Sequence, residues 1–149
     1  MQRDNAGLVV LSRRLPVVAG PSAHLSWDEL ACHDGTPYPG KWREDRAVVL
    51  GQVFEAVREA TGSRPLAVLS GYRTPGYNRA IRGASKSQHV QGRALDLRPP
   101  DGMDAREFGA IVRAVAEMMP EGGGVGQYRT FVHVDTRPRN HGHLTTWDG

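Results

Sequence analysis

The chain has 149 residues, 39% hydrophobic and 23% charged, which is enough for one domain with a buried core. Its net charge of +3 fits an anionic partner such as a cell-wall polymer or a nucleic acid, but it equally fits an ordinary solvated surface. Because no block of Lys and Arg marks a nucleic-acid-binding arm, we expect no nucleic-acid function. With Cys32 as the single cysteine, an internal disulfide and a cysteine zinc cage are excluded.

The N-terminal segment is expected to be irregular up to about residue 24, with residues 8–11 as a candidate edge strand. It contains no apolar run long enough for a signal peptide or a membrane span. A protein acting outside the cell would then need a removed leader or another means of release. We expect one domain over residues 1–149, with its core at about 24–137, acting as a monomer.

Helices are predicted at four places by capping and periodicity. Ser26 and Glu29 have the spacing of a capping box and predict a short helix. Residues 42–60 and 104–119 are amphipathic, the second with Asp104 as its N-cap, and Pro75 opens a brief helix over 74–81. The expected buried stripe of the first amphipathic helix consists of Val49, Val53, Ala56, Val57 and Ala60.

Strands are predicted by short apolar runs that end in turn residues. The run at 65–70 is a buried strand that opens into a loop, and "ALDL" at 94–97 is a second. The segments 124–128 and 130–137 form a hairpin across Arg129, and Trp147 is expected to anchor the polar tail by packing. The sequence therefore predicts an α+β fold, a small and mostly antiparallel sheet with helices on one face.

The stretch "SKSQHVQGRALDL" (85–97) places an imidazole and a carboxylate at the junction of a loop and a strand. Side chains alternate along a strand, so Asp96 points away from the core face taken by Leu95 and Leu97. A carboxylate in mid-sheet is costly to desolvate unless it is paired or binds a cation. Because Gly92 lets the loop turn sharply, His89 can reach Asp96.

The segment "TFVHVDT" (130–136) repeats this pattern, with His133 and Asp135 on the face opposite the valines. If that face meets Asp96, then His89, Asp96 and His133 form a zinc site with three protein ligands and a position left for water. Other divalent metals are compatible with these ligands. The alternative is structural: Asp96 pairs with a neighbouring arginine, and the histidines are satisfied core residues.

The motifs "SGYRTPGYN", "GASKSQHVQGRALDL" and "FVHVDTR" together resemble the zinc D-alanyl-D-alanine carboxypeptidase and murein endopeptidase family. The family mark is Ser-x-His, then Gly and Ala, then Asp seven positions after the His, with a second His on a distant strand. In this chain the Ser and the first His are Ser87 and His89, the Asp is Asp96, and the second His is His133. The resemblance covers about residues 70–137, and "LSWDELACHDG" is similar to the carboxypeptidase-like branch.

The resemblance implies a fold like that of the D-Ala-D-Ala peptidases and hedgehog proteins, with Zn²⁺ on the sheet face opposite the helices. It implies that His89, Asp96 and His133 are the metal ligands. Arg73 corresponds to the arginine that faces the substrate carbonyl and the developing oxyanion, and Ser87 to a residue that contacts substrate. The implied function is a zinc metallopeptidase acting on peptidoglycan stem or cross-link peptides, at bonds that contain D-amino acids.

One position departs from the family pattern. Many members carry an acid three residues before the second His ligand as the general base, and this chain has Thr130 there. We assign the base to Asp135, with a role in orienting an imidazole as its alternative; His141 and His143 are weaker candidates. If no base exists, the domain is a catalytically silent zinc module that binds the cell wall or serves a structural role.

Overall fold

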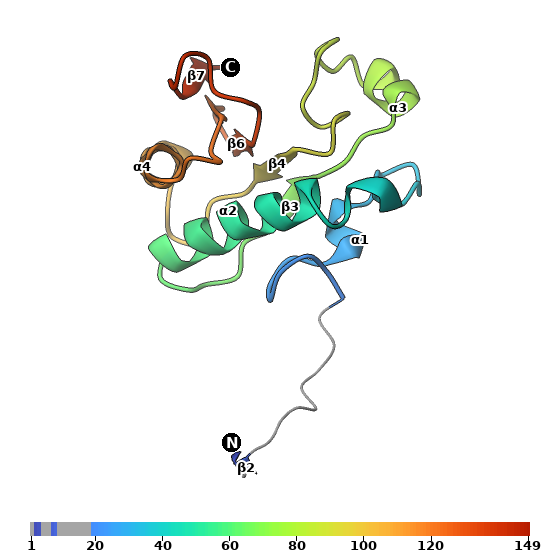
Figure 1. Cartoon of the computed structure of the whole chain (residues 1–149). Coiled ribbons are helices and arrows are strands. Elements are labelled where there is room, and N and C mark those ends of the chain that lie inside the picture. The colour runs from blue at the N-terminus through green and yellow to red at the C-terminus, as the bar shows by residue number, and fades with distance from the viewer. Residues whose placement is uncertain (1, 4–6, 9–18) are drawn as a thin grey trace.

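The computed structural model describes residues 2–3, 7–8 and 19–149 (Figure 1). Most of the candidate edge strand at residues 8–11 lies outside these residues, and the short strands β1 and β2 pair with each other. The helices and strands of the described residues, in chain order, are β1 (Gln2–Arg3), β2 (Gly7–Leu8), α1 (Trp27–Leu30), the 3₁₀ turn Gly40–Trp42, α2 (Arg46–Ala60), β3 (Val68–Ser70), α3 (Pro75–Ala80), β4 (Ala94–Leu97), α4 (Ala105–Met118), β5 (Gly124–Gln127), β6 (Val132–Asp135) and β7 (Thr145–Asp148).

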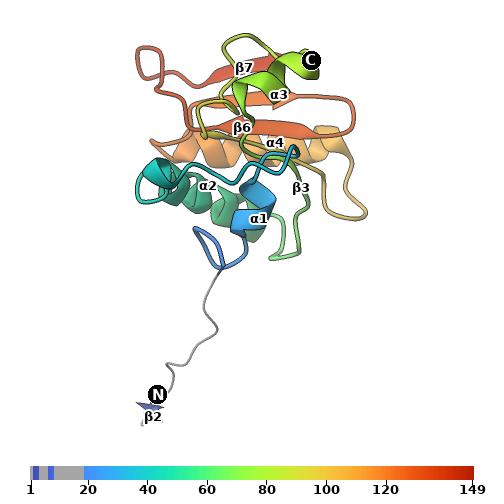
Figure 2. The ribbon, with the colours of Figure 1, turned by 90° about the vertical axis from the view of Figure 1, so that its right-hand side faces the viewer.

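The main sheet has five strands in the order β3-β4-β6-β5-β7. Neighbouring strands in this sheet are antiparallel, except that β5 and β7 are parallel to each other. Figures 1 and 2 show α2 and α4 together on one side of this sheet. The predicted α+β fold is confirmed. The polar tail, for which we predicted only a packing residue, adds the edge strand β7.

Capping side chains set the helix starts. Ser26 and Glu29 form the predicted capping box of α1. Helix α2 begins at Arg46 rather than near Trp42, because residues 40–42 form a 3₁₀ turn and the carboxylate of Asp45 then accepts from the first helical amide. Asp104 caps α4 as predicted, by accepting from the amide of Glu107.

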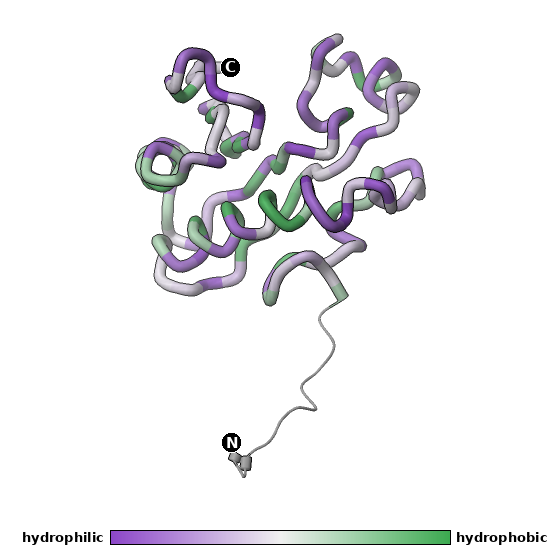
Figure 3. The backbone as a smooth tube through the Cα atoms, viewed as in Figure 1, coloured by the Kyte–Doolittle hydropathy of each residue, from purple (hydrophilic) through white to green (hydrophobic). Residues whose placement is uncertain are grey.

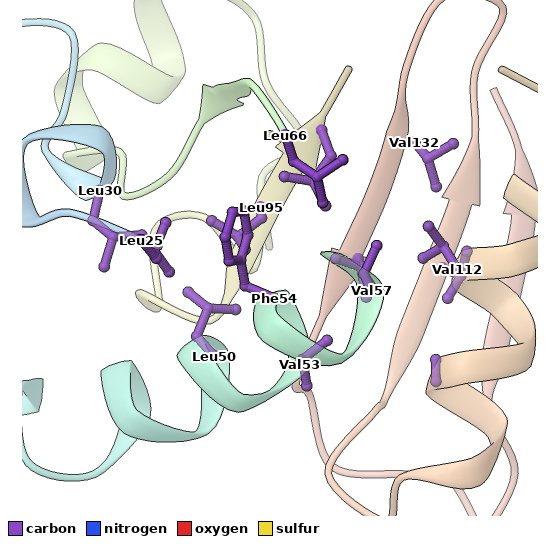
Figure 4. Packing of buried hydrophobic residues seen from close by; sticks show 14 of the residues in the cluster. Leu25, Leu30, Leu50, Val53, Phe54, Val57, Leu66, Leu95, Val112 and Val132 are labelled. Atoms are coloured by element: carbon purple, nitrogen blue, oxygen red, sulfur yellow. The ribbon is translucent and has the colours of Figure 1, made fainter. Parts of the chain in front are cut away.

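The core lies between the sheet and the two long helices (Figures 3 and 4). Of the stripe predicted for α2, only Val53 and Val57 are buried, because the helix turns Leu50 and Phe54 inward in place of Val49 and Ala60. Burial of each such side chain is worth about 1.5–3 kcal/mol. This layer of apolar side chains packs against one face of the sheet, and the opposite face remains available for polar side chains.

Strands β4 and β6 lie side by side in a register that sorts their side chains by chemistry. Leu95 pairs with Val134 and Leu97 with Val132, and these apolar side chains are fully buried in the core. By alternation, the intervening pair, Asp96 opposite His133, points away from the helices. The predicted alternation of these two strands is therefore confirmed.

None of the helices in the described residues has both the length and the apolar character needed to cross a membrane.

The turn before α1 is tied to α2 through one carboxylate. Glu55 accepts from the hydroxyl of Ser22 at 2.7 Å and from the amide of His24 at 2.8 Å, and its other oxygen lies 2.8 Å from Nδ1 of His24. Partial burial works to raise the pKa of Glu55, but these hydrogen bonds outweigh it and lower the pKa below the usual 4.5. The tie therefore depends on the ionised carboxylate.

We predict that Glu55→Gln lowers stability by about 1 kcal/mol at pH 7 and by much less at pH 3. A carboxyl with a lowered folded-state pKa stabilises above its unfolded-state pKa, and this stability is lost as the pH falls through the folded-state pKa. Thermal unfolding of both proteins at the two pH values measures the difference. Glu59→Gln, exposed on the same helix, is the control; an equal loss at both pH values would contradict the prediction.

Candidate metal centre and its cleft

Three side chains from separate segments converge on the open face of the sheet. Nε2 of His89 and Nδ1 of His133 lie 3.2 Å and 3.0 Å from the same oxygen, Oδ1 of Asp96. The donor atoms of the three residues all lie within 4.8 Å of one another, and all three residues are buried. The structure therefore brings together the three residues that the sequence singled out as metal ligands.

The orientation of His89 is fixed by its own loop. Its Nδ1 donates to the carbonyl oxygen of Gly71 at 2.7 Å, which leaves the lone pair of Nε2 facing Asp96. In return, the amide of Arg73 donates to the carbonyl of His89 at 3.1 Å. The loop passes through Gly92 at a positive φ of 68°, where a side chain would also collide with Trp42.

The orientation of His133 is fixed by Asp135. Nε2 of His133 donates to Oδ2 of Asp135 at 2.8 Å, which leaves Nδ1 facing Asp96. Asp135 is fully buried, and its carboxylate also accepts from Nε and Nη2 of Arg137. Of the two roles predicted for Asp135, these contacts favour the orienting one, because both carboxylate oxygens already have partners and neither is exposed.

The same contacts set the charges of the site. Burial lowers the pKa of His89 by more than the nearby carboxylate raises it. Burial also acts to lower the pKa of His133, but the bonds to Asp135 and Asp96 prevail and raise it. The hydrogen bond from His133, followed by that from Arg137, overcomes the effect of burial and holds the pKa of Asp135 at about 2, so this carboxylate is ionised at neutral pH.

Zinc fits this donor set. Two imidazole nitrogens and one carboxylate oxygen are ligands that zinc prefers, and each imidazole is held by an outer hydrogen bond of the kind found around bound zinc. Burial acts to raise the pKa of Asp96, but its contacts with His133 and His89 hold that pKa well below the usual range, so the ionised carboxylate adds the negative charge that a divalent cation needs. The residues present are thus suited to the ion that the sequence pattern implies.

Arg73 lies beside this cluster with its guanidinium held at three points. Nε donates to Oγ of Ser70 at 3.2 Å, Nη1 to Oδ1 of Asn78 at 3.2 Å and Nη2 to Oδ2 of Asp96 at 3.4 Å. Asn78 braces the loop by donating to the carbonyl of Ala84, and it also orients Arg73. This second contact could not be read from the sequence.

The cluster opens into a cleft of about 740 Å³. On the β3 side of the sheet it is lined by Arg73 and the segment 81–88, which includes Ser87, and on the β5 and β7 side by Tyr128, Phe131 and Trp147. Oγ of Ser87 accepts from the amide of His89, so the residue predicted to contact substrate also braces His89. The sequence indicated Trp147 only as a packing residue of the polar tail, and it gave no sign that Trp147 and Tyr128 line the cleft.

The weaker candidates for a base, His141 and His143, are exposed and do not line the cleft. The same holds for Thr130, at the position where many family members carry an acid. Among the described residues that do line the cleft, Asp96 is the only carboxylate.

Strand β5 carries glycine at both positions that face the site. A Cβ on Gly124 would lie 2.7 Å from the carboxylate oxygens of Asp135, and one on Gly126 would lie 2.5 Å from the ring of Trp147. Real Cβ atoms do not approach so closely. The two glycines therefore make room for the group that orients His133 and for the indole that covers it.

Comparison with known proteins gives a family match over most of the chain. Residues 23–135 match the family described as Peptidase M15. The matched range contains β3 to β6, His89, Asp96 and His133, and it ends before β7.

Two kinds of curated relative are similar to part of the chain. The Peptidoglycan L,D-endopeptidase MepK of Escherichia coli K12 is 34% identical over 85 residues, which are 52% of this chain and 43% of that protein. The Zinc D-Ala-D-Ala carboxypeptidase of Streptomyces albus G is 35% identical over 68 residues, 46% of this chain and 25% of that protein. The chain thus spans less than half the length of these relatives.

We predict that Asp135→Asn weakens zinc binding by about 10- to 100-fold, because the imidazole of His133 loses the carboxylate that fixes its tautomer. Titration of the metal-free protein with zinc against a competing chelator measures the affinity. Asp148→Asn, an exposed carboxylate on β7, is the matched control.

The role of Asp135 as general base predicts a different outcome. The variant would then bind zinc with unchanged affinity and lose only turnover, and that result would contradict the orienting role.

Proposed function

Because the chain belongs to the Peptidase M15 family, we propose that it is a zinc-dependent peptidase that hydrolyses peptidoglycan peptides at bonds involving D-amino acids. The observation that carries the proposal is the convergence of His89, Asp96 and His133 beside a cleft of about 740 Å³. One relative is named for L,D-cleavage of peptidoglycan and the other for the D-Ala-D-Ala bond, so both names support this substrate class.

In this proposal Nε2 of His89, Nδ1 of His133 and the carboxylate of Asp96 hold the zinc ion. When bound, zinc supplies a Lewis acid that polarises a carbonyl and makes water a nucleophile near neutral pH. The protein keeps the lone pairs of these two ring nitrogens directed at one point. It does so through the carbonyl of Gly71 and the carboxylate of Asp135, which each bind the other nitrogen of an imidazole ring.

We assign Arg73 the role of stabilising the carbonyl oxygen of the scissile bond as negative charge develops on it. Its contacts with Ser70, Asn78 and Asp96 support this role, because a guanidinium held in place before substrate arrives needs little reorganisation in the transition state. We assign Ser87 a contact with substrate, since it lines the same cleft.

The charge of the cleft supports an acidic substrate. Its lining residues include the cations Arg73, Arg82, Lys86 and Arg137, against a single carboxylate. Peptidoglycan stem peptides carry free carboxylates, which such a surface attracts. The exposed Arg82 and Lys86 are the residues free to meet these groups, because Arg137 is paired with Asp135.

A second candidate function is a catalytically silent zinc module that binds cell-wall peptides. It is favoured by the absence, among the described residues lining the cleft, of any carboxylate besides Asp96 that could take a proton. The two candidates differ in one measurement, the cleavage of a peptide that both would bind.

We predict that the isolated protein holds about one zinc ion per chain and cleaves purified cross-linked muropeptides. His89→Ala and His133→Ala reduce both the zinc content and the cleavage to background, because each removes one of three ligands. Elemental analysis and separation of the products by chromatography and mass spectrometry measure the two quantities.

Chelation abolishes cleavage and added zinc restores it. His143→Ala, an exposed histidine outside the cleft, is the matched control and keeps both properties. A zinc-loaded wild-type protein that binds these muropeptides and leaves them intact would reject the peptidase and support the silent module.

A further inference from the structure

The cleft wall opposite Arg73 contains a hydroxyl group to which no role has yet been assigned. We propose that the hydroxyl of Tyr128 donates a hydrogen bond to an oxygen of the bound peptide, and that Trp147 is the positioning residue that orients it. This inference rests on the proposed function, because it concerns the same cleft.

The ring of Tyr128 is held rigidly. It stacks on Phe131 with ring centroids 4.5 Å apart and an interplanar angle of 4°. The amide of Tyr128 also donates to the carbonyl of Phe131 at 3.0 Å, which closes the hairpin between β5 and β6. A stacked ring at the end of a paired strand has little freedom, so its hydroxyl occupies a fixed position on the cleft wall.

Hydrogen-bond chemistry decides what this hydroxyl can do. Nε1 of Trp147 lies 3.0 Å from the hydroxyl oxygen of Tyr128, and an indole nitrogen can only donate. Tyr128 therefore accepts from Trp147, and its own proton must point to another acceptor. No described residue accepts it, and the residue lines the cleft. The unused donor is thus available to a ligand with an oxygen acceptor, such as a peptide carbonyl or a carboxylate.

The strand order places this donor across the metal ligands from Arg73. Arg73 follows β3, the ligands Asp96 and His133 lie on β4 and β6, and Tyr128 and Trp147 lie beyond them at β5 and β7. Figure 1 shows β7 and α3, the helix that follows Arg73, on opposite sides of β4 and β6. A peptide over the metal centre would therefore meet a guanidinium from one wall and a phenol from the other.

Trp147 is itself fixed by its surroundings. Its ring lies over Gly126, where any side chain would collide with it. The ring centroid is 5.2 Å from that of His133, and the guanidinium of Arg137 lies 5.0 Å from the indole. Trp147, which orients Tyr128, lies on β7, and β7 lies outside the range matched by the family.

The experiment uses the zinc-loaded full chain and purified cross-linked muropeptides. Tyr128→Phe removes only the hydroxyl, and we expect kcat/KM to fall by about 10-fold or more, with zinc content and thermal stability unchanged. Trp147→Phe keeps an aromatic ring but removes the indole donor, and we expect a smaller loss. Tyr77→Phe, whose hydroxyl contacts His33 outside the cleft, is the matched control and leaves kcat/KM unchanged.

A double-mutant cycle tests the positioning role. If Trp147 acts through the hydroxyl, Trp147→Phe causes no further loss in a Tyr128→Phe background. Losses that multiply in the double variant would overturn the role of Trp147, and an unchanged kcat/KM for Tyr128→Phe would overturn the role of Tyr128.

The outcomes also separate this inference from the proposed function. If the wild-type protein cleaves the muropeptides and Tyr128→Phe is equally active, the function stands and the inference fails. If the wild-type protein binds without cleaving, calorimetry measures the affinity directly. A drop of about 10-fold for Tyr128→Phe then supports the inference while the peptidase fails. A wild-type protein that neither binds nor cleaves them rejects both.

Discussion

The site depends on the register in which β4 pairs with β6. Leu95 and Leu97 must face the helices together with Val132 and Val134, because the core is built from these side chains. A slip of one residue would turn all of them to the open face. The hydrophobic layer therefore holds Asp96 opposite His133, although neither residue contributes to the core. Burial of apolar surface on one side of the sheet thus supplies the precision that the polar groups need on the other.

Around Asp96 and His133, further polar groups fix the orientation of the imidazole rings. His89 and His133 each use one ring nitrogen for an outer acceptor, and so present the other nitrogen to Asp96. Burial makes unpaired groups costly, so the ring orientations are well defined. Asp135 lies next to this pair, and its pairing with Arg137 supports the proposal that it holds an imidazole rather than exchanges protons.

Local patterns in the sequence were enough to predict much of this arrangement. The alternation in "ALDL" and "FVHVDT" correctly identified the core face, and the caps Ser26 and Asp104 fixed two helix starts. Only two of the five positions predicted for the buried stripe of α2 are buried, because Val49 and Leu50 are both apolar and only the packed sheet decides between them. Strand β7 was missed, since its polar sequence becomes a strand only by pairing with β5. Contacts between distant segments, such as that of Trp147 with Tyr128, leave no local pattern.

The two hydrogen bonds between residues 71–73 and His89 have a consequence for protein engineering. The carbonyl of Gly71 accepts from the ring of His89, while the carbonyl of His89 accepts from the amide of Arg73. These two hydrogen bonds therefore join the two loops directly, without involving the sheet. Transplanting only the side chains of His89, Asp96 and His133 onto another scaffold would leave the imidazole of His89 without the carbonyl that orients it. The smallest portable unit is the pair of loops together with the strands that carry them.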